Sequence, residues 1–188
     1  MTVEEAIYHR RSIRKFDQRP VDKTDLLRLV DLARLSASGG NRQPLRFAIV
    51  TDPIKVAALS GQIHWAMYLP DFKVETEELP PAYIVLLREE CVCSQCQYEV
   101  GAASTSIFLA AEERGLSTCA LGSFSAEYLR ELLELPSLLH PELVIAIGYG
   151  AQKSRIKPYV DTVKYRQDED GTFYVPKYSL AEVLVYED

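Results

Sequence analysis

The sequence has 188 residues, of which 47% are hydrophobic and 26% charged, as is typical of one ordinary globular domain. A chain of this length buries about 70% of the surface that its unfolded state exposes, which excludes disordered, collagen-like and disulfide-dependent miniprotein classes. The formal net charge of −6 argues against nucleic-acid binding, because such domains usually carry a net positive face. No apolar run approaches the ~18 residues of a membrane helix, and the acidic start MTVEEAIYHRRS is unlike a signal peptide, so a cytoplasmic protein without a membrane partner is expected.

Helix-capping residues and hydrophobic periodicity predict the elements of the first half of the chain. Thr2 and Glu5 have the spacing of a capping box, and Asp52-Pro53 reads as an N-cap followed by the first helical residue. The predicted elements are a helix from Val3 to about Arg10 or Arg11, a helix opened by Asp22, a loop over 36–44, a strand over 46–50, a helix from Asp52 to about Gly61 and an irregular stretch over 64–81.

The second half continues the mixture of helices and strands. Its predicted elements are a strand over 82–88, a helix over 98–114 closed by Gly115, a strand over 117–121, a helix from Ser125 to about Leu135, a strand over 142–149, a hairpin of 162–167 with 172–175, and a terminal helix started by Ser179. We therefore expect an α+β fold with a mixed sheet flanked by helices, organised as a single domain over 1–188. Residues 151–188 are too polar to form a core by themselves.

A cluster of basic residues near the start could bind a phosphate. Arg10, Arg11 and Arg14 offer guanidinium forks and Ser12 offers a hydroxyl, which together suit a small anionic ligand. The alternative is a solvated patch at a helix end, where basic side chains complement the helix dipole.

Two glycine-containing turns could bring backbone N–H groups close to a ligand. In Ser38-Gly39-Gly40-Asn41 the adjacent glycines permit a close approach, although a helix C-cap with a turn explains the same residues. In Cys119-Ala120-Leu121-Gly122-Ser123 a strand end precedes a capped helix, which is also the pattern of an ordinary strand-to-helix turn.

Three of the four cysteines, Cys91, Cys93 and Cys96, lie in one short segment. With Cys119 as a fourth thiolate they could bind a metal, but no second CxxC pair completes a common zinc spacing, so no metal site is predicted. The alternative is a turn of free thiols that is sensitive to oxidation if a thiol is exposed. No nucleophile elbow or P-loop occurs, and no side chain stands out as a catalytic acid, base or nucleophile, which favours an enzyme whose cofactor carries the chemistry.

Four segments, taken in order, resemble the nitroreductase family of FMN-dependent oxidoreductases. They are RRSIRKF, SASGGNRQPLRF, GLSTCALGSF and PKYSLAEV, and the resemblance extends from Ala6 to Val185. It implies a mixed α+β domain that forms an intertwined homodimer with two FMN sites at the subunit interface. In such a dimer, residues 151–188 are expected to embrace the partner subunit.

The resemblance also implies roles for individual residues. Arg10, Arg11, Ser12 and Arg14 match the segment that binds the FMN phosphate and ribityl chain, and Lys177 matches a C-terminal basic residue that reaches the phosphate. The other matched positions are Ala37, Ser38 and Gly39, which the partner lays against the flavin ring, the polar pair Asn41 and Gln43 that follows them, and Leu121 and Gly122, whose backbone faces flavin N5. The chain departs from the family pattern at Tyr178, at Thr105-Ser106 and at Leu45, while Lys73 is a candidate cation near flavin N1.

The implied activity is hydride transfer from NAD(P)H through flavin N5 to a small acceptor by a ping-pong mechanism. The acceptors of the family include nitroaromatics, quinones, activated alkenes and free flavin, and the sequence does not choose among them. Two alternatives stay open: a divergent branch that fragments flavin or removes halogen, and a flavin-binding redox or metal sensor that uses Cys91, Cys93 and Cys96.

Overall fold

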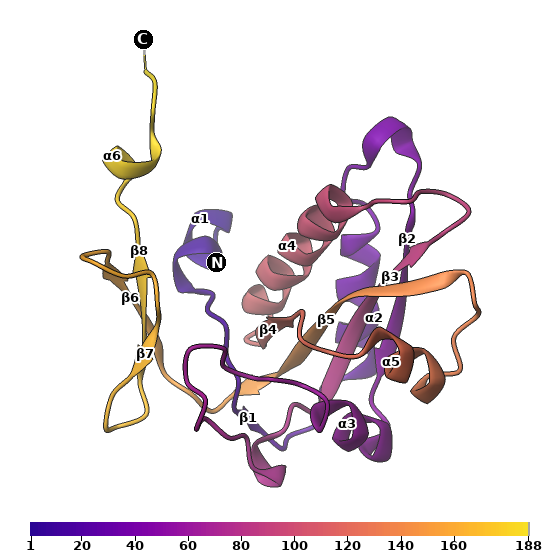
Figure 1. Ribbon diagram of the computed structural model, residues 1–188, viewed down its shortest axis with the longest axis horizontal. Helices are drawn as coiled ribbons and strands as arrows, with labels where there is room; N and C mark the ends of the chain where they lie inside the picture. The colour runs from indigo at the N-terminus through magenta and orange to yellow at the C-terminus, as the bar shows by residue number, and fades with distance from the viewer. Residues whose placement is uncertain (188) are drawn as a thin grey trace.

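The computed structural model describes residues 1–187 and has an α+β fold in which helices flank a five-stranded antiparallel sheet (Figure 1). The strands of this sheet are β1 (Phe16–Asp17), β2 (Leu45–Val50), β3 (Ala82–Glu89), β4 (Ser117–Leu121) and β5 (Leu139–Gly150). Their order is β1-β5-β3-β2, and β4 also pairs with β5. The long β5 is therefore the central strand. It pairs with β3 along one side and with both β4 and β1 along the other.

Helices cover both faces of the sheet. These helices are α2 (Lys23–Ala33), α3 (Pro53–Ser60), α4 (Gln97–Glu113) and α5 (Ala126–Leu132). Helix α1 (Val3–His9) packs on α4, α6 (Leu180–Val183) lies in the tail, and η1 (Gly39–Asn41) and η2 (Thr76–Glu78) are short 3-10 turns. Along β3, Ile84 and Leu86 face α2 and α4, whereas Tyr83 and Val85 face α3 and α5. Because both faces are buried, β3 reads as a continuous hydrophobic run rather than an alternating one.

A buried hydroxyl pair joins the sheet to α3. The Tyr83 hydroxyl lies 2.6 Å from Ser60 Oγ, which also donates to the Val56 carbonyl at 2.7 Å. Burial raises the pKa of Tyr83 above its ordinary value, so the phenol stays protonated and remains a hydrogen-bond donor.

Most predicted elements are confirmed, and local sequence explains why. The capping boxes at Thr2 and Ser179 both form, and Gly115 follows α4 with a left-handed φ of 68°. The helix after Ser125 ends at Leu132, earlier than predicted, and the left-handed backbone of Glu134 (φ 52°) keeps the chain from continuing as a helix. The irregular stretch 64–81 includes the short η2.

The tail of the chain forms a second sheet beside the main one. It contains β6 (Ser154–Pro158), β7 (Arg166–Gln167) and β8 (Phe173–Lys177) in the order β6-β8-β7. The predicted hairpin is confirmed as β7 with β8, but β6, which pairs in parallel with β8, was not predicted. Figure 1 shows this tail to one side of the main sheet, with the chain continuing past α6 over residues 184–187.

One buried ring anchors the tail to the body, and the end of the tail is uncovered. Phe173 is fully buried against Phe72, with ring centroids 5.3 Å apart. Beyond it, Leu180 is 74% exposed and Val185 is 95% exposed. No helix among residues 1–187 is both long and apolar enough to cross a membrane.

Candidate functional site

The basic segment Arg10–Arg14 runs alongside β4. Helix α1 ends because Arg10 adopts an extended conformation (φ −58°, ψ 137°), and the chain then forms a parallel bridge between Ser12 and Thr118. The Ile13 N–H donates to the Thr118 carbonyl at 3.0 Å. In extended backbone, successive side chains point to opposite faces, so this segment divides its side chains between two environments.

The buried thiol of Cys119 in β4 lies beside the Ser12 hydroxyl and near the charges of Arg10 and Arg14. Burial raises the pKa of this thiol, and the charges of Arg14 and Arg10, with the Ser12 hydroxyl, partly oppose the rise. The Arg10 guanidinium lies over the Phe108 ring of α4, 5.3 Å from its centroid, and its buried Nε has no hydrogen-bond partner among residues 1–187. An unpaired buried guanidinium nitrogen is costly in isolation, so this nitrogen is suited to an anionic ligand.

Arg11 is directed elsewhere. Its guanidinium donates to the carbonyls of Arg10 and of Tyr8, the latter at 2.6 Å. It borders a polar cavity of about 290 Å³ together with Lys153 and Arg155. Burial lowers the pKa of Arg11, as does the nearby charge of Arg10.

The same cavity contains buried polar atoms that the sequence analysis did not consider. Gln152 Nε2 and Ser154 Oγ are buried without a hydrogen-bond partner, and both residues line the cavity. The sequence does contain a signal for this cavity: a second basic pair, Lys153 and Arg155, follows soon after β5, the last strand of the main sheet.

Arg14 is largely engaged by the protein itself. Its Nε donates to the Trp65 carbonyl at 2.6 Å, and its guanidinium lies over the rings of Tyr165 and Phe173, at 4.8 and 5.2 Å from their centroids. Arg14 thus joins the loop after α3 to the tail sheet.

The turn after β4 lies beside Arg14. The Ser123 hydroxyl donates to the His64 carbonyl at 3.0 Å, so the turn and Arg14 contact consecutive residues of one loop. Leu121 is buried, whereas Gly122 is exposed, with no atom within 4 Å of the position that a side chain would occupy. The structure therefore brings Leu121 and Gly122 into the same region as the basic segment.

The loop that carries Ala37, Ser38, Gly39, Asn41 and Gln43 lies at the other end of α4. The Gly39 N–H donates to Glu99 Oε1 at 3.0 Å, and the Gln43 N–H donates to Ser38 Oγ at 3.0 Å. Asn41 and Gln43 both have left-handed backbones, with φ of 53° and 50°. Ala37, Ser38 and Gln43 line a mostly apolar cavity of about 340 Å³ between α2 and β2.

One chain does not bring this loop to Arg10. The loop is held by Glu99 in the first turn of α4, whereas Arg10 packs on Phe108, nine residues further along the same helix. At 1.5 Å per residue these two positions are about 13 Å apart along the axis. Lys177 ends β8, about 13 Å of extended strand beyond Phe173, which contacts Arg14.

The departures from the family pattern have local partners. Ser106 shares a hydrogen bond with Ser36 at 2.9 Å, and Thr105 donates to the Gly101 carbonyl at 2.9 Å. Leu45 lines the apolar cavity beside Gln43. The ring centroids of Tyr178 and Tyr159 are 4.5 Å apart. The side chain of Lys73, the candidate cation, is exposed. Within residues 1–187, no three His, Cys, Asp or Glu side chains gather in a way that could hold a metal ion.

The sequence matches one family pattern and is similar to several known proteins. The sequence pattern of the nitroreductase family matches residues 7–82 and 97–149. An Archaeoglobus fulgidus protein with the provisional name NADH dehydrogenase/NAD(P)H nitroreductase is 30% identical over 152 residues, which are 76% of this chain and 82% of that protein. The FMN reductase [NAD(P)H] of Bacillus subtilis is 29% identical over 163 residues, covering 79% of this chain and 66% of the reductase.

The fold has close counterparts among solved structures. A provisionally named nitroreductase from Desulfovibrio desulfuricans superposes with a TM-score of 0.75 at 23% identity, covering 100% of this chain and 98% of its own. The family pattern spans the segments that carry the basic cluster, the glycine loop and the turn after β4. The chain therefore belongs to the nitroreductase family.

Proposed function

We propose that this protein is an FMN-dependent oxidoreductase that takes hydride from NADH or NADPH and delivers it to a small electron acceptor. Nitroaromatics, quinones and activated alkenes are the acceptor classes that we propose. Family membership supports this proposal, as do the name of the Bacillus relative, an FMN reductase, and the crystal structure of the Desulfovibrio relative, which is a complex with FMN.

The observation that carries the proposal is the state of Arg10. Its buried Nε has no partner, although it lies within a segment that matches the phosphate-binding motif of the family. A phosphate oxygen supplies the charged acceptor that this nitrogen lacks. The residues present therefore fit FMN: Arg10 and Ser12 would hold the phosphate and ribityl chain, and the exposed Gly122 would leave its backbone N–H free for the flavin ring.

Bound FMN would supply a carrier that accepts and releases hydride, so the protein needs no catalytic acid or base of its own. The chain's residues would bind and orient this carrier. Arg10 would hold the anionic end by charge, and the open backbone at Gly122 would leave room for a planar ring. Arg14 joins the loop at Trp65 to the tail at Phe173 and would thereby keep the wall of the site in place.

We further propose that the complete site forms only in a homodimer. The loop 37–43 and the basic segment are separated along α4, so a second copy would have to bring its loop to the first copy's Arg10. The exposed apolar residues Leu180 and Val185 support a tail that packs on the partner subunit. Lys177, at the end of β8, would then be a further basic residue available to the phosphate.

An anaerobic absorbance spectrum of the purified protein between about 300 and 600 nm tests the proposal. We expect a flavin band that bleaches on addition of NADH or NADPH and returns when a nitroaromatic or quinone is added. A band that neither nicotinamide bleaches would contradict the proposed activity. Failure of FMN to copurify and to bind when added would contradict the cofactor as well.

A further inference from the structure

The cysteine-rich turn between β3 and α4 takes no part in the proposed flavin site, yet several polar contacts hold it in place. Cys91 is exposed, Cys93 is partly exposed and Cys96 is buried. Cys96 is the N-cap residue of α4, and Cys93 precedes it by three residues. The four-residue segment Cys93-Ser94-Gln95-Cys96 therefore has the CxxC spacing of redox-active dithiols.

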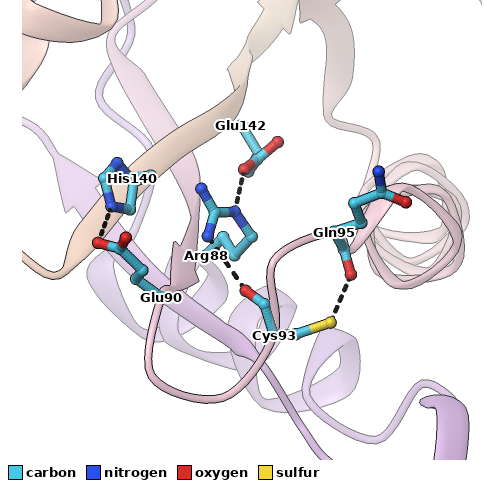
Figure 2. A network of polar contacts seen from close by, with 6 residues as sticks. All are labelled: Arg88, Glu90, Cys93, Gln95, His140 and Glu142. Carbon is cyan, nitrogen blue, oxygen red and sulfur yellow. Dashed lines mark hydrogen bonds and ion pairs between the residues drawn. The ribbon is translucent and has the colours of Figure 1, made fainter.

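One ion pair and one histidine–carboxylate hydrogen bond hold this turn against β5. Arg88 Nε contacts Glu142 at 2.7 Å, while Arg88 Nη1 donates to the Cys93 carbonyl at 3.1 Å. On the other side of the turn, His140 Nε2 lies 2.9 Å from Glu90 Oε2. Figure 2 shows Arg88 between Glu142 and the Cys93 carbonyl, with the Cys93 side chain directed toward Gln95.

The direction of the Cys93 thiol places its sulfur close to Cys96. Cys93 Sγ donates to the Gln95 carbonyl, with a sulfur–oxygen distance of 2.6 Å. That oxygen belongs to the same planar peptide unit as the Cys96 Cα, so Cys93 Sγ lies at most about 5.5 Å from Cys96 Cα. This separation is short enough for a disulfide after rotation of the Cys96 side chain and a small shift of the turn.

We propose that Cys93 and Cys96 form a dithiol that a hydroperoxide oxidises to a reversible intrachain disulfide. Of these two thiols Cys93 reacts first, because it is partly exposed whereas Cys96 is buried. Burial raises the pKa of Cys96 to about 11, so it stays a protonated thiol at neutral pH and is a poor first nucleophile.

The reaction has two steps. The Cys93 sulfur attacks the peroxide, the O–O bond breaks, and Cys93 becomes a sulfenic acid while one water or alcohol leaves. The Cys96 sulfur then attacks the sulfenic sulfur, and the hydroxyl leaves with the Cys96 proton as water. Overall two thiols are oxidised, one peroxide is reduced, and an external dithiol reverses the change.

The position of the dithiol connects it to the loop 37–43, a step that rests on the proposed function. Cys96 caps α4, and Glu99, three residues later, accepts the hydrogen bond from Gly39. Closing the disulfide displaces the Cys93 carbonyl from Arg88 and shifts the first turn of α4. We therefore expect oxidation to alter FMN affinity by about 2- to 12-fold, the effect of one hydrogen bond.

The bond is detected by mass spectrometry of the full-length protein after treatment with hydrogen peroxide. No Lys or Arg lies between Arg88 and Arg114, so all three thiols of the turn share one tryptic peptide, 89–114. We expect this peptide to lose 2 Da and to leave only one cysteine open to iodoacetamide, with both changes reversed by dithiothreitol. Addition of oxygen without the 2 Da loss would overturn the proposal.

Serine variants identify the partners. Cys91→Ser is the matched control from the same turn and should keep the 2 Da loss, whereas Cys93→Ser and Cys96→Ser should both abolish it. A loss that persists in Cys93→Ser would assign the bond to other thiols and overturn the proposal. If burial makes Cys96→Ser fail to fold, fragmentation of the Cys91→Ser peptide still decides the pair, because only Cys93 and Cys96 remain in it.

FMN titrations of the reduced and oxidised protein separate the two proposals. A change of affinity in the wild type that is absent from Cys93→Ser supports the coupling, and equal affinities refute the coupling. If FMN binds neither form while the 2 Da loss occurs, the proposed flavin function fails and the dithiol stands.

Discussion

Substitution of Arg10 by alanine gives the most direct test of how the basic segment binds its ligand. The change removes a guanidinium whose Nε is buried without a partner and whose carbon lies 5.3 Å from the centre of the Phe108 ring. We expect FMN binding to weaken strongly, while the apoprotein stays folded, because no protein acceptor is paired with that nitrogen.

The magnitude follows from the kind of contact that is lost. A hydrogen bond to a charged group contributes about 1.5–3 kcal/mol, which corresponds to a roughly 10- to 150-fold rise in the Kd for FMN. The contact of Arg10 with Phe108 contributes about 0.5–1 kcal/mol and acts on the stability of the apoprotein rather than on the ligand. Arg10→Lys keeps the charge but loses the planar fork, so an intermediate Kd is expected.

Quenching of FMN fluorescence on titration with apoprotein measures the Kd, and thermal unfolding of each apoprotein shows whether the variant is folded. Arg28→Ala is the matched control, because Arg28 lies on the surface of α2 and pairs with Asp31 at 2.8 Å. A Kd for Arg10→Ala within twofold of the wild type would refute the assignment of Arg10 to the phosphate. Equal weakening by Arg28→Ala would show that the loss reflects net charge alone.

Three further predictions concern stability and assembly. Tyr83→Phe should lower the free energy of unfolding by about 1 kcal/mol in urea titrations, because it removes one side of the buried hydroxyl pair with Ser60; an unchanged midpoint would contradict that pairing. Gly148→Ala should lower the free energy of unfolding by about 1–3 kcal/mol, because the new Cβ would lie 2.5 Å from a proline ring. Gly101→Ala, in open space on α4, should raise the free energy of unfolding by about 0.5–1 kcal/mol. The reverse order of stabilities would refute the packing argument. A chain ending at Gly150 should elute from gel filtration as a monomer without FMN, and a stable flavin-loaded dimer would show that the tail is not required.

Local features of the sequence were sufficient to predict most helices and strands. Capping boxes at Thr2 and Ser179 and the left-handed Gly115 are decided by neighbouring residues, so they could be read without knowledge of the fold. The strand β6 was missed because it pairs with β8 across some twenty residues, and nothing in its own residues shows that partner. The end of α5 was placed too late because apolar residues continue beyond Leu132.

The sequence by itself determined the chemical types available to the site: guanidinium groups and a hydroxyl after α1, a glycine loop after α2, a turn after β4 and three thiols before α4. Only the tertiary structure decided which of them meet. Arg10 and Arg14 face Cys119 while Arg11 faces a different cavity, and the loop at Gly39 is held at the far end of α4. The physical reason is that side-chain direction in an extended segment depends on its pairing with another strand, and the separation of two loops depends on the helix to which each is bonded. Contacts between residues distant in the sequence determine both.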